Sequence, residues 1–135
     1  MKEISKGIRI MKVMKRIRNL IKEKIEHRFK EMNFTGPQGF LIGILYHYGS
    51  MKISDLSDKL GLSNSTVSGI IDRLEKQEVV KRTRSEEDRR VVLVCLTDKF
   101  KKESKEHRDE IEGMFENLLE DATLEEIETI LKGLD

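Results

Sequence analysis

The sequence of 135 residues contains one cysteine, one proline and no tryptophan, and aromatic residues make up only 5% of it. The single cysteine, Cys95, excludes an intrachain disulfide. No run of 18 or more apolar residues is present, so the sequence predicts no membrane span. The N-terminal segment is basic and amphipathic but lacks the apolar block and cleavage site of a signal peptide, which predicts a cytoplasmic protein.

The residue patterns of an enzyme active site are also missing. Such a site needs a nucleophile beside a base, a carboxylate pair in a cleft or a phosphate-binding loop. The glycines are scattered as caps and turns, and His27, His47 and His107 fall on three separate predicted helices. We therefore expect no enzymatic activity, no cofactor and no metal site.

Charged residues make up 38% of the chain, yet the net charge is only +1 because the two signs are segregated. Residues 1–34 carry 11 Lys/Arg and 4 Asp/Glu, whereas residues 98–135 carry 6 and 13. Because the two terminal segments carry opposite net charge, they are expected to pair, within or between subunits. The basic N-terminal segment can also face phosphate. Two solvated helix faces without a specific partner would give the same pattern.

The segment 53–97 carries the most informative motif. A short apolar stripe ends at Gly61, which can adopt the left-handed conformation that closes a helix. Ser63 follows as the N-cap of a second helix, and this pair of helices predicts a helix-turn-helix. The apolar positions of the second helix recur at helical spacing, at Val67, Ile70, Ile71 and Leu74.

Two β-rich runs, at 79–80 and 91–96, follow this helix. They flank a hydrophilic tip from Lys81 to Arg90 that holds five basic and three acidic residues. This pattern predicts a β-hairpin appended to the helix-turn-helix, which is a winged helix. Alternation in the second strand would place Val94 and Leu96 inward and Cys95 outward, and we expect no redox trigger there.

The outward face of the second helix consists of short hydrogen-bonding side chains and one arginine. Such side chains suit a helix whose N-terminal end enters the major groove of DNA. A polar face exposed only to solvent is the alternative. The candidate DNA-binding residues on this helix are Ser63, Asn64, Ser65, Thr66, Ser68, Gly69 and Arg73.

The segment resembles the winged helix of the multiple-antibiotic-resistance (MarR) family of transcriptional regulators. The family's wing motif, Asp-x-Arg followed by five residues and Leu-Thr, is present as Asp88, Arg90, Leu96 and Thr97. One position departs from the family pattern, because Glu78 stands where a glycine is common before the wing. Without glycine, that turn must close differently or carry strain. Three further runs match in order: Leu60-Gly61-Leu62-Ser63, Thr66-Val67-Ser68 and Asp72-Arg73-Leu74-Glu75.

The resemblance also assigns roles to the wing. It implies that Arg90 inserts into the minor groove and that Asp88 orients it. Arg89 and Arg90 both fall at or near the predicted hairpin turn, where a guanidinium can reach into a narrow minor groove. Lys81, Arg82 and Arg84 would meet flanking phosphates, with solvated strand charge as the alternative. The family further implies a small aromatic or anionic effector, for which the candidate pocket residues are Arg16, His27, Phe40, Tyr46, His47 and Tyr48.

Helices are predicted on both sides of the winged helix. The first runs from Lys2 to Phe29 with apolar residues every three or four positions. A capping box from Thr35 to Gln38 opens the next helix, which Gly49 ends. Met51 to Ile53 is expected as a short strand or the remnant of one, with Ser54 capping the helix after it. A long helix from 98 to 121 has its late apolar positions at Ile111, Met114, Phe115, Leu118 and Leu119, and Thr123 caps the last helix.

The fold class predicted is mostly α with a small β-hairpin wing, a winged helix-turn-helix between terminal dimerisation helices. We expect a dimerisation helix in 1–34, the DNA-binding region in 35–97 and C-terminal dimerisation helices in 98–135, together one compact domain. The terminal helices present more apolar surface than a winged helix can cover, which predicts a homodimer on a pseudo-palindromic DNA site.

The predicted function is a sequence-specific transcriptional repressor of double-stranded DNA, modulated by a small ligand. A winged helix used for protein–protein assembly and a sequence-blind, nucleoid-type DNA binder are the alternatives, since fold alone does not imply function.

Overall fold

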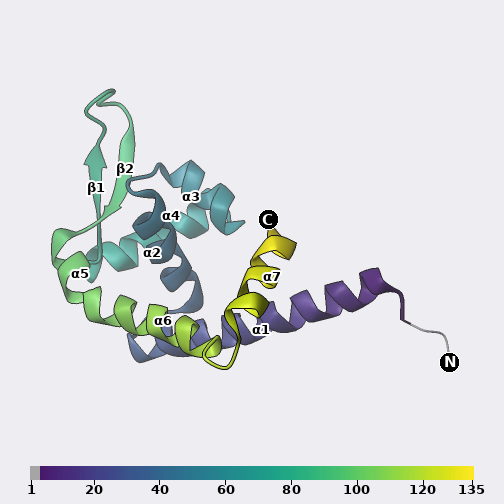
Figure 1. Cartoon of the computed structure of the whole chain (residues 1–135). Coiled ribbons are helices and arrows are strands. Elements are labelled where there is room, and N and C mark those ends of the chain that lie inside the picture. The colour runs from purple at the N-terminus through teal and green to yellow at the C-terminus, as the bar shows by residue number, and fades with distance from the viewer. Residues whose placement is uncertain (1–3) are drawn as a thin grey trace. The chain divides into compact units, whose positions relative to one another are not determined.

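The computed structural model describes residues 4–135, apart from the side chains at positions 111, 114, 115 and 118. The chain divides into two compact units, Met1–Phe100 and Lys101–Asp135. Helices and one antiparallel hairpin make up the described part, which confirms the predicted fold class (Figure 1). The elements are α1 (Lys6–Glu31), α2 (Gly36–Tyr48), α3 (Ile53–Leu60), α4 (Asn64–Lys76), β1 (Val80–Arg84), β2 (Val92–Leu96), α5 (Asp98–Glu103), α6 (Lys105–Leu118) and α7 (Leu124–Leu134).

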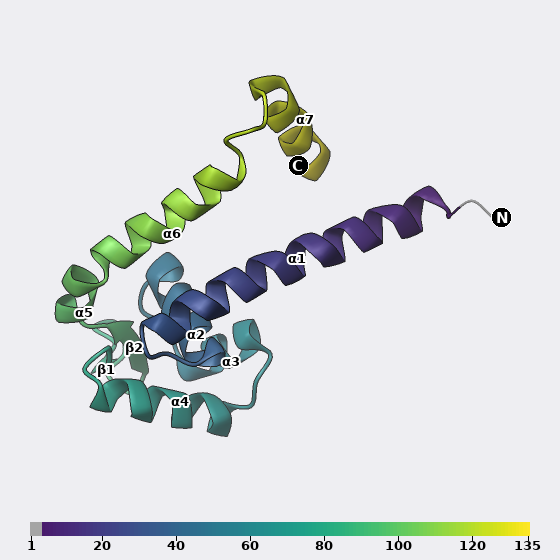
Figure 2. The ribbon, with the colours of Figure 1, turned by 90° about the horizontal axis from the view of Figure 1, so that it is seen from below.

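The first unit has one apolar core that fixes α4 and the hairpin relative to each other. Figure 2 shows α2, α3 and α4 gathered at the base of the hairpin. Each of these elements contributes a side chain that solvent does not reach, so the hairpin and the helices share one packed interior. The largest of these fully buried side chains are Leu41, Leu56, Ile71, Leu74, Val67, Val80 and Val94.

The predicted helix boundaries around the turn of the helix-turn-helix are confirmed. Gly61 lies in the left-handed region at φ 66° and ψ 31°. The N–H of Leu62 donates to the carbonyl oxygen of Ser57 at 3.2 Å, which satisfies the end of α3. Ser63 then caps α4, because its Oγ accepts from the N–H of Thr66 at 3.2 Å.

The start of α2 also follows the prediction. Thr35 Oγ1 accepts from the N–H of Gln38 at 3.3 Å, and the side chain of Gln38 accepts from the N–H of Thr35 at 3.0 Å. This is the predicted capping box, and Gly49 ends the helix at φ 79°. Gly39 in this helix lies against α1, since a Cβ there would fall 2.1 Å from the ring of Phe29.

The predicted strand at 51–53 is reduced to one residue. Met51 pairs with Val94 through two backbone hydrogen bonds of 3.0 and 2.8 Å, which adds an isolated bridge to the edge of the hairpin. The chain then turns directly into α3, which begins at Ile53. Lys52 is therefore the N-cap residue, without a side-chain cap, and the prediction that Ser54 caps this helix is wrong.

The flanking helices differ in detail from the prediction. The first helix begins at Lys6, after Ser5 as the cap, and extends to Glu31 rather than Phe29; Lys2 lies outside the described residues. The predicted long helix after residue 98 is two helices, α5 and α6, interrupted at Ser104. The buried hydroxyl of Ser104 donates to the carbonyl oxygen of Lys101 at 3.5 Å, a local bond that competes with the helical ladder.

The last helix begins at the predicted cap, where Thr123 and Glu126 form a second capping box. The side chains of Ile111, Met114, Phe115 and Leu118, expected to form the apolar end of the long helix, lie outside the described residues. Among the helices that the structure describes, none is both long and apolar enough to cross a membrane.

Candidate nucleic-acid interface

The N-terminal end of α4 presents a group of exposed hydroxyls. Ser63 Oγ lies 3.2 Å from Ser65 Oγ and 2.8 Å from Thr66 Oγ1, and all three residues are exposed, as is Asn64. Burial of the apolar side of α4 turns this polar side outward. The hydroxyl groups, the free N–H groups of the first turn and the positive end of the helix dipole all suit contact with phosphate or base edges.

The remaining predicted residues of α4 continue along this surface. Arg73 is exposed, while Ser68 and Gly69 are half-buried. Nothing lies within 4 Å of the position that a Cβ on Gly69 would occupy. Packing inside the protein therefore does not require glycine at this position. Glycine makes a helix interior less stable than alanine does, by about 1 kcal/mol, so the residue is not explained by the stability of α4.

At the tip of the hairpin, Asp88 holds Arg90. Its Oδ1 accepts from the backbone N–H of Arg90 at 3.0 Å and from Nε of the same residue at 3.3 Å. The side chain of Arg90 is nevertheless 93% exposed. The guanidinium of Arg84 donates to the carbonyl oxygen of Arg89 at 2.9 Å, which ties the end of β1 to the tip. The tip therefore presents arginine side chains on a hydrogen-bonded turn.

Arg82 differs from the other wing arginines, because its guanidinium has two carboxylate partners in the protein. Nη1 lies 2.7 Å from Glu75 Oε1 and Nη2 lies 2.8 Å from Asp72 Oδ1. The backbone N–H of Arg82 also donates to Glu75 Oε2 at 3.3 Å. The hydrogen bond with Asp72, together with the charges of both carboxylates, raises the pKa of Arg82 above its ordinary value. The sequence placed Arg82 among the phosphate contacts, and the structure shows it joining β1 to α4.

The turn before the wing shows how the chain accommodates Glu78 in place of glycine. Glu78 itself adopts the left-handed conformation at φ 61°. The N–H of Val79 donates to the carbonyl oxygen of Leu74 and that of Glu78 to Glu75, both at 3.0 Å, which is the pattern of a Schellman cap. The turn thus keeps the left-handed backbone conformation that glycine would adopt. This conformation is strained at Glu78 because the residue has a Cβ atom.

The carboxylate of Glu78 has a partner on the next helix. Its Oε2 lies 2.7 Å from Nζ of Lys99. The hydrogen bond from Lys99, with its charge, holds the pKa of Glu78 below the ordinary value of 4.5. This ion pair connects the turn that precedes the wing to the start of α5, which follows the wing.

The residues predicted to line an effector pocket lie in several places. Arg16 and His27 are exposed on α1, and His27 lies 3.5 Å from Glu31. Phe40 packs edge-on against Phe29. At the end of α2, His47 and Tyr48 contact each other edge-on, Lys59 Nζ lies 3.9 Å from the Tyr48 ring, and Tyr46 is exposed nearby in sequence.

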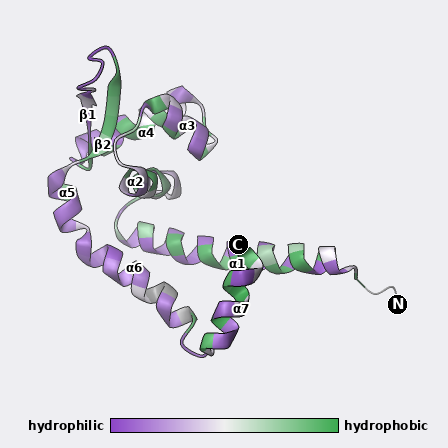
Figure 3. Cartoon of the chain, turned by 45° about the horizontal axis from the view of Figure 1, so that its top comes forward, coloured by the Kyte–Doolittle hydropathy of each residue, from purple (hydrophilic) through white to green (hydrophobic). Residues whose placement is uncertain are grey.

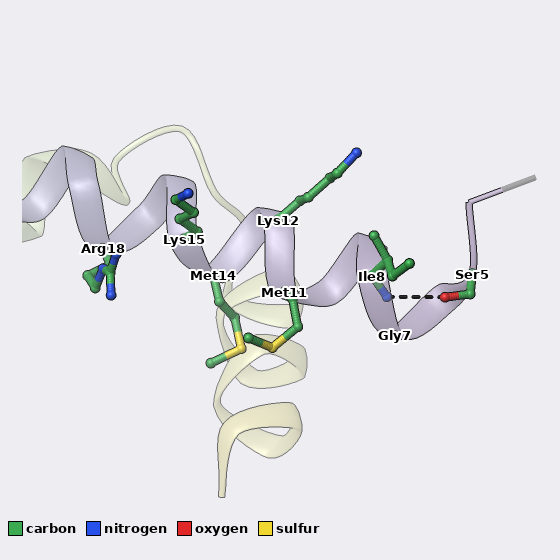
Figure 4. A pocket seen from close by; sticks show the side chains of 8 residues that line it. All are labelled: Ser5, Gly7, Ile8, Met11, Lys12, Met14, Lys15 and Arg18. Carbon is green, nitrogen blue, oxygen red and sulfur yellow. Dashed lines mark hydrogen bonds between the residues drawn. The ribbon is translucent and has the colours of Figure 1, made fainter.

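A hollow of about 730 Å³ lies elsewhere, along the first half of α1 (Figure 4). None of the six predicted pocket residues lines it. Figure 4 shows Met11 and Met14 pointing to one side of the helix and Lys12 to the other. The apolar stripe of the first predicted helix, which predicts a dimerisation surface, is the sequence signal for this part of α1. The lining residues are Ser5, Gly7, Ile8, Met11, Lys12, Met14, Lys15 and Arg18.

Comparison with known proteins identifies the family. The MarR family model matches residues 34–92. Over 125 residues the chain is 33% identical to the uncharacterized HTH-type transcriptional regulator YsmB of Bacillus subtilis, which covers 93% of this chain and 86% of YsmB. The chain belongs to the MarR family. MarR proteins are DNA-binding transcriptional regulators and not enzymes, which confirms the predicted family, fold and general class.

Other MarR-type proteins extend this comparison. The chain is 44% identical over 72 residues to the uncharacterized HTH-type regulator YfiV of Bacillus subtilis, a match that spans 53% of this chain and only 45% of YfiV. A MarR family protein from Bacillus stearothermophilus superimposes with a TM-score of 0.85 at 25% identity, covering 98% of this chain and 94% of that one. A Staphylococcus aureus MepR variant bound to an oligodeoxyribonucleotide shares the fold, with a TM-score of 0.64 at 22% identity and coverage of 98% and 94%.

Proposed function

We propose that this MarR protein is a sequence-specific transcriptional repressor that binds a pseudo-palindromic operator as a homodimer. One observation carries the proposal: a single packed unit presents both the exposed hydroxyls at the start of α4 and the exposed arginine at the tip of the hairpin. A protein-docking winged helix has no need of an arginine tip. The MepR structure with a bound oligonucleotide supports DNA as the partner of this fold.

In the proposed complex, α4 enters the major groove with its N-terminal end. Asn64, Ser65 and Thr66 then lie nearest the bases and phosphates, followed by Ser68 one turn later. Gly69 allows the helix backbone to approach closely. Arg73 contributes the long side chain of this surface, and its guanidinium can pair with guanine in the major groove or with phosphate.

The hairpin tip contributes the second contact. An arginine placed in a narrow minor groove is attracted by the negative potential there. Arg90 takes this role, Asp88 holds its Nε group, and Arg89 lies beside it on the same turn. Glu86 and Glu87 on the tip are exposed and oppose the phosphate charge, which tunes the wing below its highest affinity.

We propose that a second copy of the chain covers the apolar face of α1. Figure 3 shows hydrophobic positions recurring along this helix. Ile8, Met11 and Ile17 are 54%, 65% and 51% exposed, although a helix with such a stripe is stabilised by burying it. A two-fold axis between the copies would place two α4 helices on half-sites about 10 base pairs apart.

The dimer is tested by sedimentation equilibrium of the full chain and of Ile17→Lys. We expect the wild-type chain to sediment as a dimer and the variant to dissociate, because a charge in an apolar interface is left unpaired. Glu23→Lys is the control, because it adds a lysine at an exposed position of the same helix outside the apolar stripe, and it should remain dimeric. A monomeric wild-type chain would contradict the dimer.

Modulation by a small aromatic or anionic effector is part of the proposal. The side chains of Tyr48, His47 and Lys59 form one cluster at the end of α2 and on α3, with a cation that an aromatic anion can pair with. Benzoate is a suitable probe. We expect it to raise the melting temperature of the wild-type chain and to leave that of Tyr48→Ala unchanged; no shift in the wild type would argue against this site.

The DNA proposal is tested by titrating the chain with a random-sequence duplex at several salt concentrations. The logarithm of the affinity should fall linearly with the logarithm of salt, with a slope of about −0.9 for each phosphate contacted. Absence of binding at low salt would favour the protein-assembly alternative. If the chain binds duplex DNA but a selection from a random duplex pool enriches no sequence, the nucleoid-type alternative is favoured.

A further inference from the structure

We infer that Arg82 is a positioning residue, which locks the wing to the DNA-reading helix and does not itself contact DNA. The inference rests on the proposed function, because the two parts that Arg82 joins are those proposed to enter the major and minor grooves. Arg82 is on β1, whereas its two partners, Asp72 and Glu75, are on α4.

We call the contact between Arg82 and the two carboxylates of Asp72 and Glu75 the clamp, because its geometry fixes β1 against α4. The two nitrogens Nη1 and Nη2 reach different carboxylates, and Glu75 accepts from both the side chain and the backbone N–H of Arg82. Three hydrogen bonds of 2.7, 2.8 and 3.3 Å therefore fix this part of β1 against one side of α4. The planar guanidinium holds Nη1 and Nη2 in fixed directions toward the two carboxylates, whereas a lysine ammonium concentrates its donors on one nitrogen and lacks this fixed geometry.

The clamp lies between the two elements that are proposed to contact DNA, α4 and the hairpin tip. Asp72 and Glu75 flank Arg73 along α4, and Arg82 precedes the tip that carries Arg90. The side chain of Arg82 is 27% exposed, compared with 93% for Arg90. An arginine whose donors are held by two carboxylates has little to offer a phosphate, but it fixes the separation between α4 and the hairpin.

The clamp also changes the charge of the DNA-facing surface. Without Arg82, Asp72 and Glu75 would place two unpaired negative charges on the helix that approaches DNA. Arg82 pairs with both, which reduces their repulsion of phosphate. Arg82 thus fixes the hairpin against α4. It also offsets the negative charge of Asp72 and Glu75, the two carboxylates that hold it in place.

Three variants separate a clamp from a direct phosphate contact. The double variant Asp72→Ala/Glu75→Ala frees Arg82 and removes two negative charges. If Arg82 contacts phosphate, this variant binds DNA more tightly; if it is a clamp, the variant binds more weakly. Glu86→Ala/Glu87→Ala is the matched control, because it removes the same charge from the wing tip and should increase affinity. Arg82→Lys keeps the charge and should also weaken binding if the residue is a clamp.

The probe is the duplex selected from a random pool, or a random-sequence duplex if none is enriched, and the readout is the dissociation constant. We expect about a tenfold loss for both clamp variants, in the range typical of disturbing one DNA-contacting element. Affinity that rises equally in Asp72→Ala/Glu75→Ala and in Glu86→Ala/Glu87→Ala would overturn the inference. Wild-type affinity in Arg82→Lys would overturn it as well.

Hydrogen exchange without DNA provides a second readout that does not depend on the proposed function. The backbone amides of β1 should exchange several-fold faster in Arg82→Lys and in Asp72→Ala/Glu75→Ala than in the wild type, while those of α2 should not change. If the wild-type chain binds no duplex, the proposed function fails, and the exchange rates still decide whether the clamp exists. Unchanged exchange in β1 would refute the clamp whatever the affinities show.

Discussion

The hydroxyl of Thr97 donates a hydrogen bond of 2.6 Å to the carbonyl oxygen of Glu78. The two residues lie at opposite ends of the wing, since Glu78 precedes β1 and Thr97 follows β2. The N–H of Thr97 also donates to the carbonyl oxygen of Val79 at 3.0 Å, and its Oγ1 accepts from the N–H of Phe100 at 3.1 Å. One threonine therefore closes the base of the hairpin and starts the following helix.

Replacing Thr97 by valine keeps the shape of the side chain and removes both hydroxyl bonds. We expect Thr97→Val to lower the free energy of unfolding by about 1–2 kcal/mol, the range for a lost helix cap or hydrogen bond. Thr97→Ser keeps the hydroxyl and should lose much less. Denaturant unfolding measures both values, and equal losses in the two variants would show that the hydroxyl is not the stabilising group.

The ion pair between Glu78 and Lys99 predicts a pH dependence of stability. Because the pKa of Glu78 in the folded chain lies below 4.5, the pair stabilises the fold above that pH, and this contribution is lost as the pH falls through the folded value. Glu78→Gln should therefore be less stable than the wild type at neutral pH, and the difference should shrink in acid. A difference that does not change with pH would contradict this account.

Gly69 provides a test that separates stability from binding. Gly69→Ala should raise the free energy of unfolding by about 1 kcal/mol, because the added methyl group meets open space within a helix. The same methyl group should lower DNA affinity by keeping the backbone of α4 away from the duplex. Gly43→Ala in α2 also meets open space and is the control, with higher stability and unchanged affinity. Tighter binding by Gly69→Ala would remove this part of α4 from the interface.

Arg90 and Asp88 at the tip of the wing can be tested by substitution. Arg90→Ala should lower affinity for a selected duplex by about tenfold or more, the usual cost of one specific arginine contact. Its melting temperature should not change, because the side chain is 93% exposed. Asp88→Ala should also weaken binding, although it removes a negative charge, because Arg90 loses the carboxylate that holds it. Affinity that increases in Asp88→Ala would mean that the carboxylate only repels DNA.

The features that the sequence predicted correctly depend on neighbouring residues. The caps at Thr35, Ser63 and Thr123 and the left-handed Gly61 follow from side chains or backbone freedom within three or four positions. The hairpin could also be predicted, because its alternation and polar tip are continuous in sequence.

The features that were missed depend on tertiary contacts. Met51 pairs with Val94, more than forty positions away, and α3 begins two residues after this bridge with Lys52 and not Ser54 before it. Arg82 looked like Arg84 in the sequence, and only the packing of β1 against α4 shows that it meets Asp72 and Glu75. The interruption at Ser104 had no glycine or proline to mark it.

The central claim is that the exposed side of α4 and the arginine tip of the wing read DNA as part of a two-fold symmetric dimer. Selection of bound sequences from a random duplex pool at physiological salt tests it most directly. The account predicts an enriched inverted repeat with half-sites about one helical turn apart. Recovery of no enriched sequence, with a wild-type chain that is folded and dimeric, would contradict it.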